Sequence, residues 1–293
     1  MNKPIEKGKT GEISSTVLPN FMIIGAEKAG TTALSQFLRQ HPDVCFSLPK
    51  ETWFFNRRYH KGIDWFASHF EHWDGETAIG EGTARLLQSE EAPARIVNHI
   101  PDVQLICLLR NPIDRAFSQY HFYLYTGRAD PDQSFGELVR EQNTEFGRDL
   151  VNQGRYINHL RRYERTFRRA QIEVVLHRDL RRHPKKVVQH LYETIGVDAS
   201  FVPDVESRHN VTKYPTSRTV YATLRNAWQI VFSRAETYFP DAIDTLRSFA
   251  RRVLFDTSKP SMAEEDRAYL QQVYEDPNRE LERWLGKDLS HWK

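Results

Sequence analysis

The sequence predicts an α/β fold in which a mostly parallel central sheet is flanked by helices on both faces. Short apolar runs alternate along the chain with longer segments that have helical periodicity. Glycine or Asn-Pro signals stand where several of these runs would give way to a helix. Alternation of this kind favours parallel strands joined by helical crossovers.

The expected strands are the apolar runs. The first is Phe21–Ile24, and the helical pattern that follows it ends near Pro42. Four further runs have the pattern of strands: Val44–Phe46, Thr77–Glu81, Val103–Leu109 and Ile172–Leu176. The run at 103–109 is the most apolar of the set, which indicates a buried central strand.

The expected helices are marked by their ends. The periodic segments are Ala92–Ile100, Asn111–Thr126, Arg155–Arg169 and a helix from Pro184 to Gly196. Asn111 before Pro112 is a helix start, because Asn caps an N-terminus and Pro suits the first turn. The last third, from about 203 to 293, has mainly helical and loop character. We expect residues 1–17 to form a flexible arm and 18–293 a single domain, since no linker divides them.

Composition excludes several classes of protein. A hydrophobic content of 39% is enough for a sizeable core, and a net charge of +2 favours no polyanionic partner. Cys45 and Cys107 form no metal or redox spacing, so we expect reduced core thiols. The histidines show no metal-binding spacing either. No run of about 18 apolar residues predicts a membrane span, and residues 1–16 lack the apolar core of a signal peptide, which favours a cytoplasmic location.

A glycine-rich turn follows the first apolar run. Gly25 and Gly30 have the spacing of the Walker A loop, but Thr31 stands where that motif requires lysine, and Lys28 lies inside the turn instead. The glycines let the backbone approach a phosphate, and the first amides of the next helix are unpaired donors. The turn therefore predicts a P-loop-like core that cradles a phosphate, while ordinary ATP or GTP binding is disfavoured.

A basic residue ends the strand Val103–Leu109. Ligands of open α/β sheets bind beyond the carboxyl ends of the strands, so Arg110 is placed to bind a second phosphate, with Ser118 of the next helix facing it. The alternative is a surface arginine paired with Asp114. A magnesium-dependent nucleotidase needs an acidic residue at this strand end, so the basic one argues against that class.

A carboxylate among aromatic residues is the candidate general base. Glu51 lies in the segment Pro49–Phe55, where partial desolvation would make its carboxylate a stronger base toward an acceptor hydroxyl or amine. A surface carboxylate is the alternative. The segment Gly80–Thr83, taken alone, has the pattern of a turn.

Together these segments resemble the sulfotransferases that use 3′-phosphoadenylyl sulfate (PAPS). Phe21–Leu34 is similar to their 5′-phosphosulfate loop, and Leu109–Tyr120 to their 3′-phosphate segment. The nearest branch is the heparan-sulfate-type carbohydrate sulfotransferases, the N-sulfotransferase domains in particular. The stretches that resemble this branch are Lys50–Asn56, Tyr59–Phe66, Gly154–Leu160 and Lys259–Trp292. The likeness covers roughly residues 18–292.

The resemblance implies transfer of a sulfuryl group from PAPS to a small-molecule or glycan acceptor, with a carbohydrate expected and no metal required. It gives Glu51 the role of catalytic base and Lys28 that of the cation that stabilises the leaving phosphate. The positions that match the donor-binding motifs are Lys28, Ala29, Gly30, Thr31, Thr32, Ala33, Arg110 and Ser118. Lys50, Trp53 and His121 are candidates for contact with the acceptor.

The chain also departs from the pattern of this branch. Trp53 and Asn56 stand where the 3-O-sulfotransferases carry histidine and aspartate, and Gly82 replaces a lysine of the animal members. Asp256–Pro260 occupies the place of a Cys-flanked Lys-Gly-Arg loop, which leaves Lys259 as the candidate phosphate ligand there. These differences indicate a bacterial-type relative and leave the acceptor open.

The sequence leaves two rival functions open. A P-loop kinase for nucleotides or small molecules would need Mg²⁺ and ATP, and a non-catalytic protein would bind a nucleotide or glycan without transfer. The stretch Arg155–Lys186 holds eleven Lys/Arg against three Asp/Glu, which is typical of a solvated helix face but could also receive an anionic glycan. Nucleic acid is not expected, since no recognised binding module accompanies this stretch. The sequence gives no indication of oligomeric state.

Overall fold

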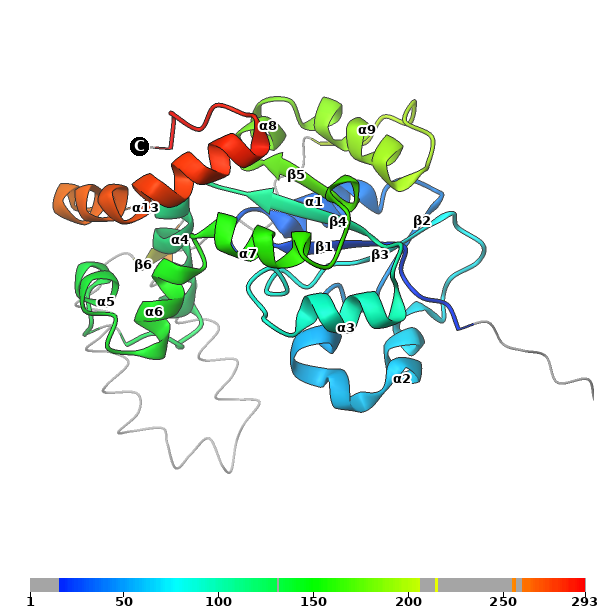
Figure 1. Cartoon of the computed structure of the whole chain (residues 1–293), viewed down its shortest axis with the longest axis horizontal. Coiled ribbons are helices and arrows are strands. Elements are labelled where there is room, and N and C mark those ends of the chain that lie inside the picture. Colours follow the sequence, from blue (N-terminus) through cyan, green and yellow to red (C-terminus); the bar gives the residue numbers. More distant parts are fainter. Residues whose placement is uncertain (1–15, 131, 206–213, 216–254, 257–259, 293) are drawn as a thin grey trace, which may run out of the picture.

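Five parallel strands form the central sheet, in the order β2-β3-β1-β4-β5 (Figure 1). The computed structural model describes residues 16–130, 132–205, 214–215, 255–256 and 260–292. The strands are β1 Phe21–Gly25, β2 Val44–Phe46, β3 Ala78–Glu81, β4 Gln104–Leu109 and β5 Ile172–Leu176. The predicted α/β class with a mostly parallel sheet is confirmed.

Nearly every residue of this sheet is buried. Only Gln104 in β4 and Glu173 in β5 are partly exposed. A parallel sheet covered on both faces has no solvent side, so its strands read as continuous apolar runs in place of an alternating pattern. This burial explains why the strands could be recognised from hydrophobicity alone.

Helices cover both faces of the sheet, and the direction of the chain decides which helix lies where. The connection from β1 to β2 runs toward one edge of the sheet, and the connection from β3 to β4 runs toward the other edge. Because such crossovers are right-handed, the helices that follow β1 and β3 must lie on opposite faces. Helices α1 Thr31–Leu38 and α9 Pro184–Ile195 pack together on one face, and α3 Ala92–His99 and α7 Tyr156–Glu164 lie on the other (Figure 1).

A second group of helices packs beside the sheet. It consists of α4 Pro112–Tyr125, α5 Phe135–Glu141, α6 Glu145–Asn152 and the long α13 Glu264–Leu285 (Figure 1). These helices share a separate hydrophobic cluster that includes Ile113, Phe117, Leu138 and Tyr274. Since α4 also begins at the end of β4, this second cluster fixes the direction in which α4 leaves the sheet.

The remaining elements are short. They are a π-helical turn η1 Phe54–Arg58, the 3₁₀ turns η2 Tyr59–Lys61, η3 Ser68–Phe70 and η4 Arg169–Gln171, the helices α2 Ile63–Ala67 and α8 His177–Arg182, and the antiparallel pair β6 Tyr214–Pro215 and β7 Phe255–Asp256. Helix α8 follows β5 directly and leads into α9.

Some helices differ from expectation. The predicted helix Arg155–Arg169 extends only over Tyr156–Glu164, because Phe167 is buried in the main core and the chain turns there. Helices α5 and α6 were not expected, although Ser134 forms a capping box with Glu137 and Thr144 caps α6. Cys45 and Cys107 are buried free thiols, as predicted.

Candidate active site

The two predicted phosphate sites lie together at the carboxyl edge of the sheet. Strands β1 and β4 are neighbours, yet the chain continues from them in opposite directions, which makes this edge the switch point of the sheet. The turn 25–30 follows β1, and Arg110 follows β4. The Arg110 Nη1 atom donates to the main-chain carbonyl of Lys28 at 3.1 Å. The structure thus joins two segments that are 82 residues apart.

The turn after β1 leaves main-chain donors at the start of α1. Gly30 is the N-cap of α1 with a φ of 103°, a conformation that suits glycine, and no side chain caps this helix end. The first amides of α1, from Thr31 to Ala33, have no carbonyl partner within the helix. Unpaired amides at a helix N-terminus can bind an anion, and the helix dipole favours negative charge there.

Two non-glycine residues near this edge have left-handed backbone. Among the described residues, only Lys28, Trp53 and Gln142 combine a side chain with such a conformation, with φ values of 68°, 60° and 47°. A conformation of this kind costs about 1–3 kcal/mol and is concentrated at functional sites. Lys28 and Trp53 both belong to the set of residues expected from the sequence to bind donor or acceptor.

The side chain of Lys28 lies against helix α4. Its Nζ atom is 3.9 Å from the centre of the Phe122 ring, a cation–π contact one turn beyond Ser118. Burial lowers the pKa of Lys28 to about 8, while nearby Glu27 opposes this shift and Arg110 adds to it. Ser118 itself is buried on the same helix. The ammonium group is therefore close to its titration range at neutral pH.

A partly buried ionic network fastens the turn to the helices beside it. Glu27 accepts from Gln119 at 3.4 Å and lies 3.4 Å from Arg85, while burial raises the pKa of its carboxyl. Arg85 also donates to the hydroxyl of Tyr123 at 2.8 Å and to Asp149 at 2.5 Å. Because these partners come from α4 and α6, the network links the position of the turn to that of the second helical group.

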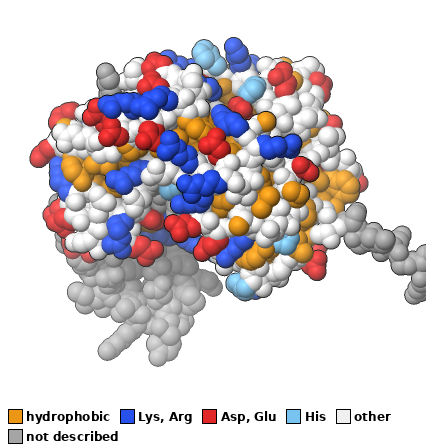
Figure 2. Space-filling view, in the orientation of Figure 1, with side chains coloured by type: hydrophobic (Ala, Val, Ile, Leu, Met, Phe, Trp, Pro, Cys, Tyr) orange, Lys and Arg blue, Asp and Glu red, His pale blue; other side chains and the backbone are white. Residues whose placement is uncertain are grey.

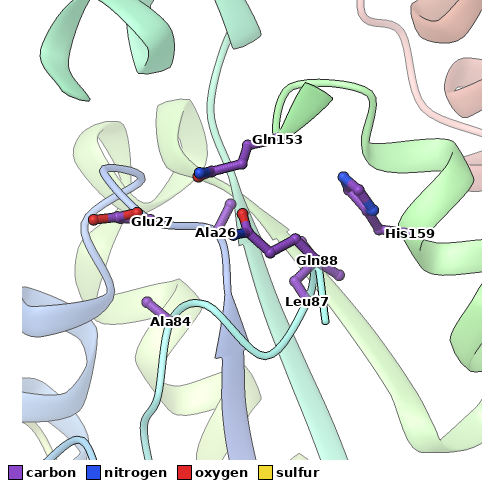
Figure 3. Close-up of a pocket in the computed structure, with 7 residues that line it drawn as sticks. All are labelled: Ala26, Glu27, Ala84, Leu87, Gln88, Gln153 and His159. Atoms are coloured by element: carbon purple, nitrogen blue, oxygen red, sulfur yellow. The ribbon is translucent and has the colours of Figure 1, made fainter. Parts of the chain in front are cut away.

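A small recess opens beside Glu27, on the side of the turn that faces α7 (Figure 3). It holds about 180 Å³ of empty space, part of it open solvent. Its lining residues are Ala26, Glu27, Ala84, Leu87, Gln88, Gln153 and His159. Pockets for small molecules usually hold about 300–1,000 Å³. The recess is therefore too small for a nucleotide, and we place no donor there.

The segment that carries Glu51 is fastened to the end of β3. The amide of Gly82 donates to the carbonyl of Lys50 at 3.1 Å, and the amide of Trp53 donates to Thr83 Oγ1 at 3.2 Å. Between these two bonds, the carboxylate of Glu81 accepts from the main-chain N–H and the hydroxyl of Thr52, both at 3.0 Å. The prediction of a turn at Gly80–Thr83 was wrong, because Gly80 and Glu81 are the last residues of β3, which is buried and hydrogen-bonded in the sheet. This stretch is instead the anchor of the segment that carries the candidate base.

Glu81 is fully buried, and its carboxylate has four donors. Besides the two groups of Thr52, it accepts from the amide of Thr83 at 3.0 Å and from the hydroxyl of Thr83. Burial raises the pKa of Glu81, while these hydrogen bonds oppose the shift. A buried carboxylate with this many donors is a rigid support, because each lost bond would leave a buried group unsatisfied.

Glu51 and the donor loop meet through Lys50. The Glu51 side chain is 31% exposed and its Oε1 atom lies 3.3 Å from Lys50 Nζ. The same ammonium donates to Thr31 Oγ1 at 3.3 Å, at the first residue of α1. A single side chain, that of Lys50, therefore connects the candidate base to the candidate phosphate-binding loop.

The other sequence candidates lie farther from this junction or outside the described chain. Trp53 is half-buried, and the guanidinium of Arg57 lies 4.7 Å from the centre of its ring. His121 is buried in the second helical group, where its ring packs edge-to-face against Phe117 and Tyr120. Lys259 lies outside the described residues.

One residue at this edge was missed by the sequence reasoning. His177 follows β5 directly, and its Cδ2 atom would lie 3.5 Å from a Cβ atom placed on Gly30. Burial lowers the pKa of His177 to about 4, and Arg110 adds to this shift, so the ring is neutral at pH 7. The signal that singled out Arg110, a polar residue after a buried strand, applies equally to His177.

Some of the arginines in the basic stretch 155–186 form ion pairs with acidic side chains. Arg161 pairs with Glu280, and Arg168 lies 3.6 Å from Asp102. Figure 2 shows Lys and Arg side chains interspersed with Asp and Glu on the face that it presents. These pairs support the interpretation as a solvated face, which the sequence favoured.

The described residues contain neither a membrane-spanning helix nor a cluster of metal ligands. None of the described helices has the length and hydropathy needed to span a bilayer. Within the same part of the chain, no group of three or more His, Cys, Asp and Glu side chains is arranged to hold a metal ion.

The family model described as "Sulfotransferase domain" matches residues 18–287. The bifunctional heparan sulfate N-deacetylase/N-sulfotransferase 3 of Mus musculus is 30% identical over 94% of the chain, and the membrane-associated sulfotransferase kil1 of Dictyostelium discoideum is 38% identical over 43%. The chain spans less than a third of the length of these relatives, 31% and 28% respectively.

A solved structure matches almost the whole fold. The crystal structure of a sulfotransferase from Alicyclobacillus acidocaldarius superimposes with a TM-score of 0.70 and 25% identity. The match covers 94% of this chain and 99% of that one.

Proposed function

The chain belongs to the sulfotransferase domain family, and from this membership we propose that it transfers a sulfuryl group from PAPS to a hydroxyl or amine of a carbohydrate acceptor. The observation that carries the proposal is the contact between Arg110 and the Lys28 carbonyl at the switch point of the sheet. It sets a guanidinium next to a phosphate-type turn, and a doubly phosphorylated adenosine requires two anion sites of this kind.

The donor is held by groups at the ends of β1 and β4 in this proposal. Main-chain amides from Gly30 to Ala33, with the hydroxyls of Thr31 and Thr32, hold the 5′-phosphosulfate. The amide of Ala29, expected from the sequence to take part, instead donates to the carbonyl of Ala26 at 3.1 Å and stabilises the turn. Arg110 and Ser118 hold the 3′-phosphate, which selects PAPS over ATP. Lys259 remains a candidate ligand of the donor. Lys28 stabilises the charge that develops on the phosphate as the S–O bond breaks, and such preorganised charge is a large term in catalysis.

The acceptor is activated by Glu51. Its carboxylate takes the proton from the acceptor oxygen or nitrogen while that atom attacks sulfur in line with the leaving phosphate. The products are adenosine 3′,5′-bisphosphate (PAP) and the sulfated acceptor. The positive charge in this scheme comes from Lys28, Arg110 and the helix amides, so the reaction needs no metal ion.

A carbohydrate is the proposed acceptor class for two reasons. The relative from Mus musculus is named for N-sulfation of heparan sulfate, and the match covers 94% of the present chain. In addition, Trp53 lies two residues beyond Glu51 and offers an indole ring of the kind that can pack on a sugar. His121 remains a second candidate for this contact, although its ring is packed between aromatic residues.

Transfer of radiolabel from PAPS tests the proposal. We would incubate the purified chain with PAPS labelled in the sulfuryl group and with an N-deacetylated heparan backbone, glucosamine oligosaccharides or p-nitrophenol. Label on either glycan supports a carbohydrate acceptor, and label on p-nitrophenol alone would contradict that part of the proposal. Binding of PAP without transfer to any of these would favour a non-catalytic binding protein.

A further inference from the structure

We propose that Lys50 is the positioning residue for the catalytic base, because its ammonium ties the carboxylate of Glu51 to the first turn of α1. This inference rests on the proposed function. The sequence made Lys50 a candidate for contact with the acceptor, and the structure gives the side chain a different set of neighbours. Its Nζ atom lies 3.3 Å from Glu51 Oε1 and 3.3 Å from Thr31 Oγ1.

The ammonium is well enclosed. The Lys50 side chain is only 16% exposed, and burial lowers its pKa while Glu51 opposes the shift. An ion pair between exposed neighbours contributes little to stability, but a partly buried ammonium is less screened by water. An ammonium has three N–H donors, and two of them are used for Glu51 and Thr31. The bridge therefore restricts both partners at the same time.

The main chain of Lys50 is fixed as well. Its carbonyl accepts from the Gly82 amide at 3.1 Å and from the Ser47 hydroxyl at 3.0 Å. The side chain thus starts from a fixed main-chain position in the segment after β2, beside the end of β3, and reaches across to α1. The position of its ammonium is set from both sides of the junction.

Gly82 leaves the room that this side chain needs. A Cβ atom at position 82 would lie 3.0 Å from Lys50 Cε and 3.3 Å from its Cγ, with Phe46 Cζ at 3.2 Å. The backbone of Gly82 does not need the conformational freedom of glycine, since no left-handed φ is found there. The absence of a side chain at this position therefore serves the close approach of the Lys50 stem.

The consequence for catalysis is geometric. A general base must lie within hydrogen-bond reach of the proton that it abstracts. With about a third of its side chain exposed, Glu51 could also rotate toward solvent. The bridge to Thr31 holds the carboxylate on the side of the donor loop. Lys50 touches no reacting atom in this scheme and acts through Glu51.

A double-mutant cycle tests the inference. Lys50→Met keeps the length of the stem and removes the charge, and Lys50→Arg keeps the charge. Each is made in the natural chain and in Glu51→Gln, and label transfer from PAPS to the N-deacetylated heparan backbone is measured. We expect Lys50→Met to lower kcat about 10–100-fold in the natural chain, since small displacements of a catalytic group have effects of this size. In the Glu51→Gln chain we expect less than about a twofold further loss, because no base is left to position.

Two additional variants separate positioning from simple packing. Lys50→Arg is expected to recover part of kcat, and Gly82→Ala, which displaces the stem, to give an intermediate loss. Lys61→Met is the matched control, since Lys61 is an exposed lysine on the nearby turn η2. If Lys50→Met lowered kcat by the same factor in the natural chain and in Glu51→Gln, the inference would be overturned. The same holds if Lys50→Met had the kcat of the natural chain.

Binding of PAP distinguishes this inference from the proposed function. Calorimetry should give Lys50→Met an affinity for PAP within about threefold of the natural chain, because the donor is held mainly by Arg110, Lys28 and the amides. A much larger loss would make Lys50 a donor ligand and contradict the positioning role. Failure of the natural chain to bind PAP would instead count against the proposed function itself.

Discussion

The guanidinium of Arg110 donates to the main-chain carbonyl of Lys28 at 3.1 Å, across the gap between the ends of β4 and β1. One arginine thus braces the turn that precedes α1 while it remains beside the expected site of a second phosphate. The contact uses Nη1. A planar guanidinium has further N–H donors, which can bind a phosphate while the brace stays in place.

Replacing Arg110 by lysine separates these two roles. Lysine keeps the positive charge but cannot make two parallel hydrogen bonds to a phosphate while it braces the turn. We expect Arg110→Lys to weaken PAP binding about tenfold, with a melting temperature within a few degrees of the natural chain. Calorimetry and thermal unfolding check both parts. An unchanged affinity would mean that Arg110 only braces the turn.

PAP binding should depend on pH through Lys28. The pKa of this lysine is lowered to about 8, mainly by burial. The phosphates of PAP favour the charged ammonium, so binding raises the pKa and takes up a proton where the free side chain is neutral. We therefore expect affinity to fall as pH rises through 8, and to be about five- to tenfold weaker at pH 9 than at pH 7.

Calorimetry in buffers with different ionisation enthalpies measures this proton uptake directly. Lys28→Arg is the matched control, since a guanidinium does not titrate in this range. Its affinity should vary little between pH 7 and pH 9. If the affinity of the natural chain for PAP also varied little between pH 7 and pH 9, this result would contradict the role given to Lys28.

Glu51→Gln tests the base. Amide and carboxylate have the same shape, but the amide cannot accept the proton of the acceptor. We expect kcat to fall about 10²–10⁴-fold, while the affinity for PAP changes by no more than about threefold. Glu71→Gln, at an exposed site outside the junction, serves as control. Full activity in Glu51→Gln would assign the proton transfer to another group.

Glu81→Gln tests the anchor of the Glu51 segment. A glutamine can direct its oxygen toward Thr52, but its NH₂ group then faces the amide of Thr83, which now donates to Glu81 Oε2 at 3.0 Å. Two donors would face each other inside the protein, at a cost of about 1–3 kcal/mol. We expect a melting temperature lower by several degrees and a reduced kcat, measured by calorimetric unfolding and label transfer. A natural kcat in this variant would show that Glu51 is positioned without the anchor.

The sheet and the donor edge were predictable from the sequence because their signals are local. Strands buried on both faces appear as apolar runs, and Arg110 follows one of them directly. The spacing of Gly25 and Gly30 likewise marks a turn that needs close backbone approach. Each of these features depends on a few residues that are consecutive in the sequence, so the sequence alone is enough to predict it.

The supports of the site were not predictable in the same way. The carboxylate of Glu81 meets Thr52 from 29 positions away, and Arg85 meets Asp149 from 64 positions away. Such pairs form only when the fold brings the segments together, and no spacing in the sequence announces them. The bridge of Lys50 to Thr31 is of the same kind. Helices α5 and α6 were missed for a different reason, since they are short and lie outside the sheet.

The most direct test of the account is calorimetric titration of the natural chain with PAP and with ATP, each with and without Mg²⁺. We expect the natural chain to bind PAP without Mg²⁺ and more tightly than ATP. The affinity of Arg110→Ala for PAP should be lower than that of the natural chain by a factor of about ten or more, since that variant loses a charge-assisted pair. A preference for ATP that depends on Mg²⁺ would contradict the donor assignment and support a kinase. Equal binding of PAP by the natural chain and by Arg110→Ala would contradict the site assigned to the 3′-phosphate.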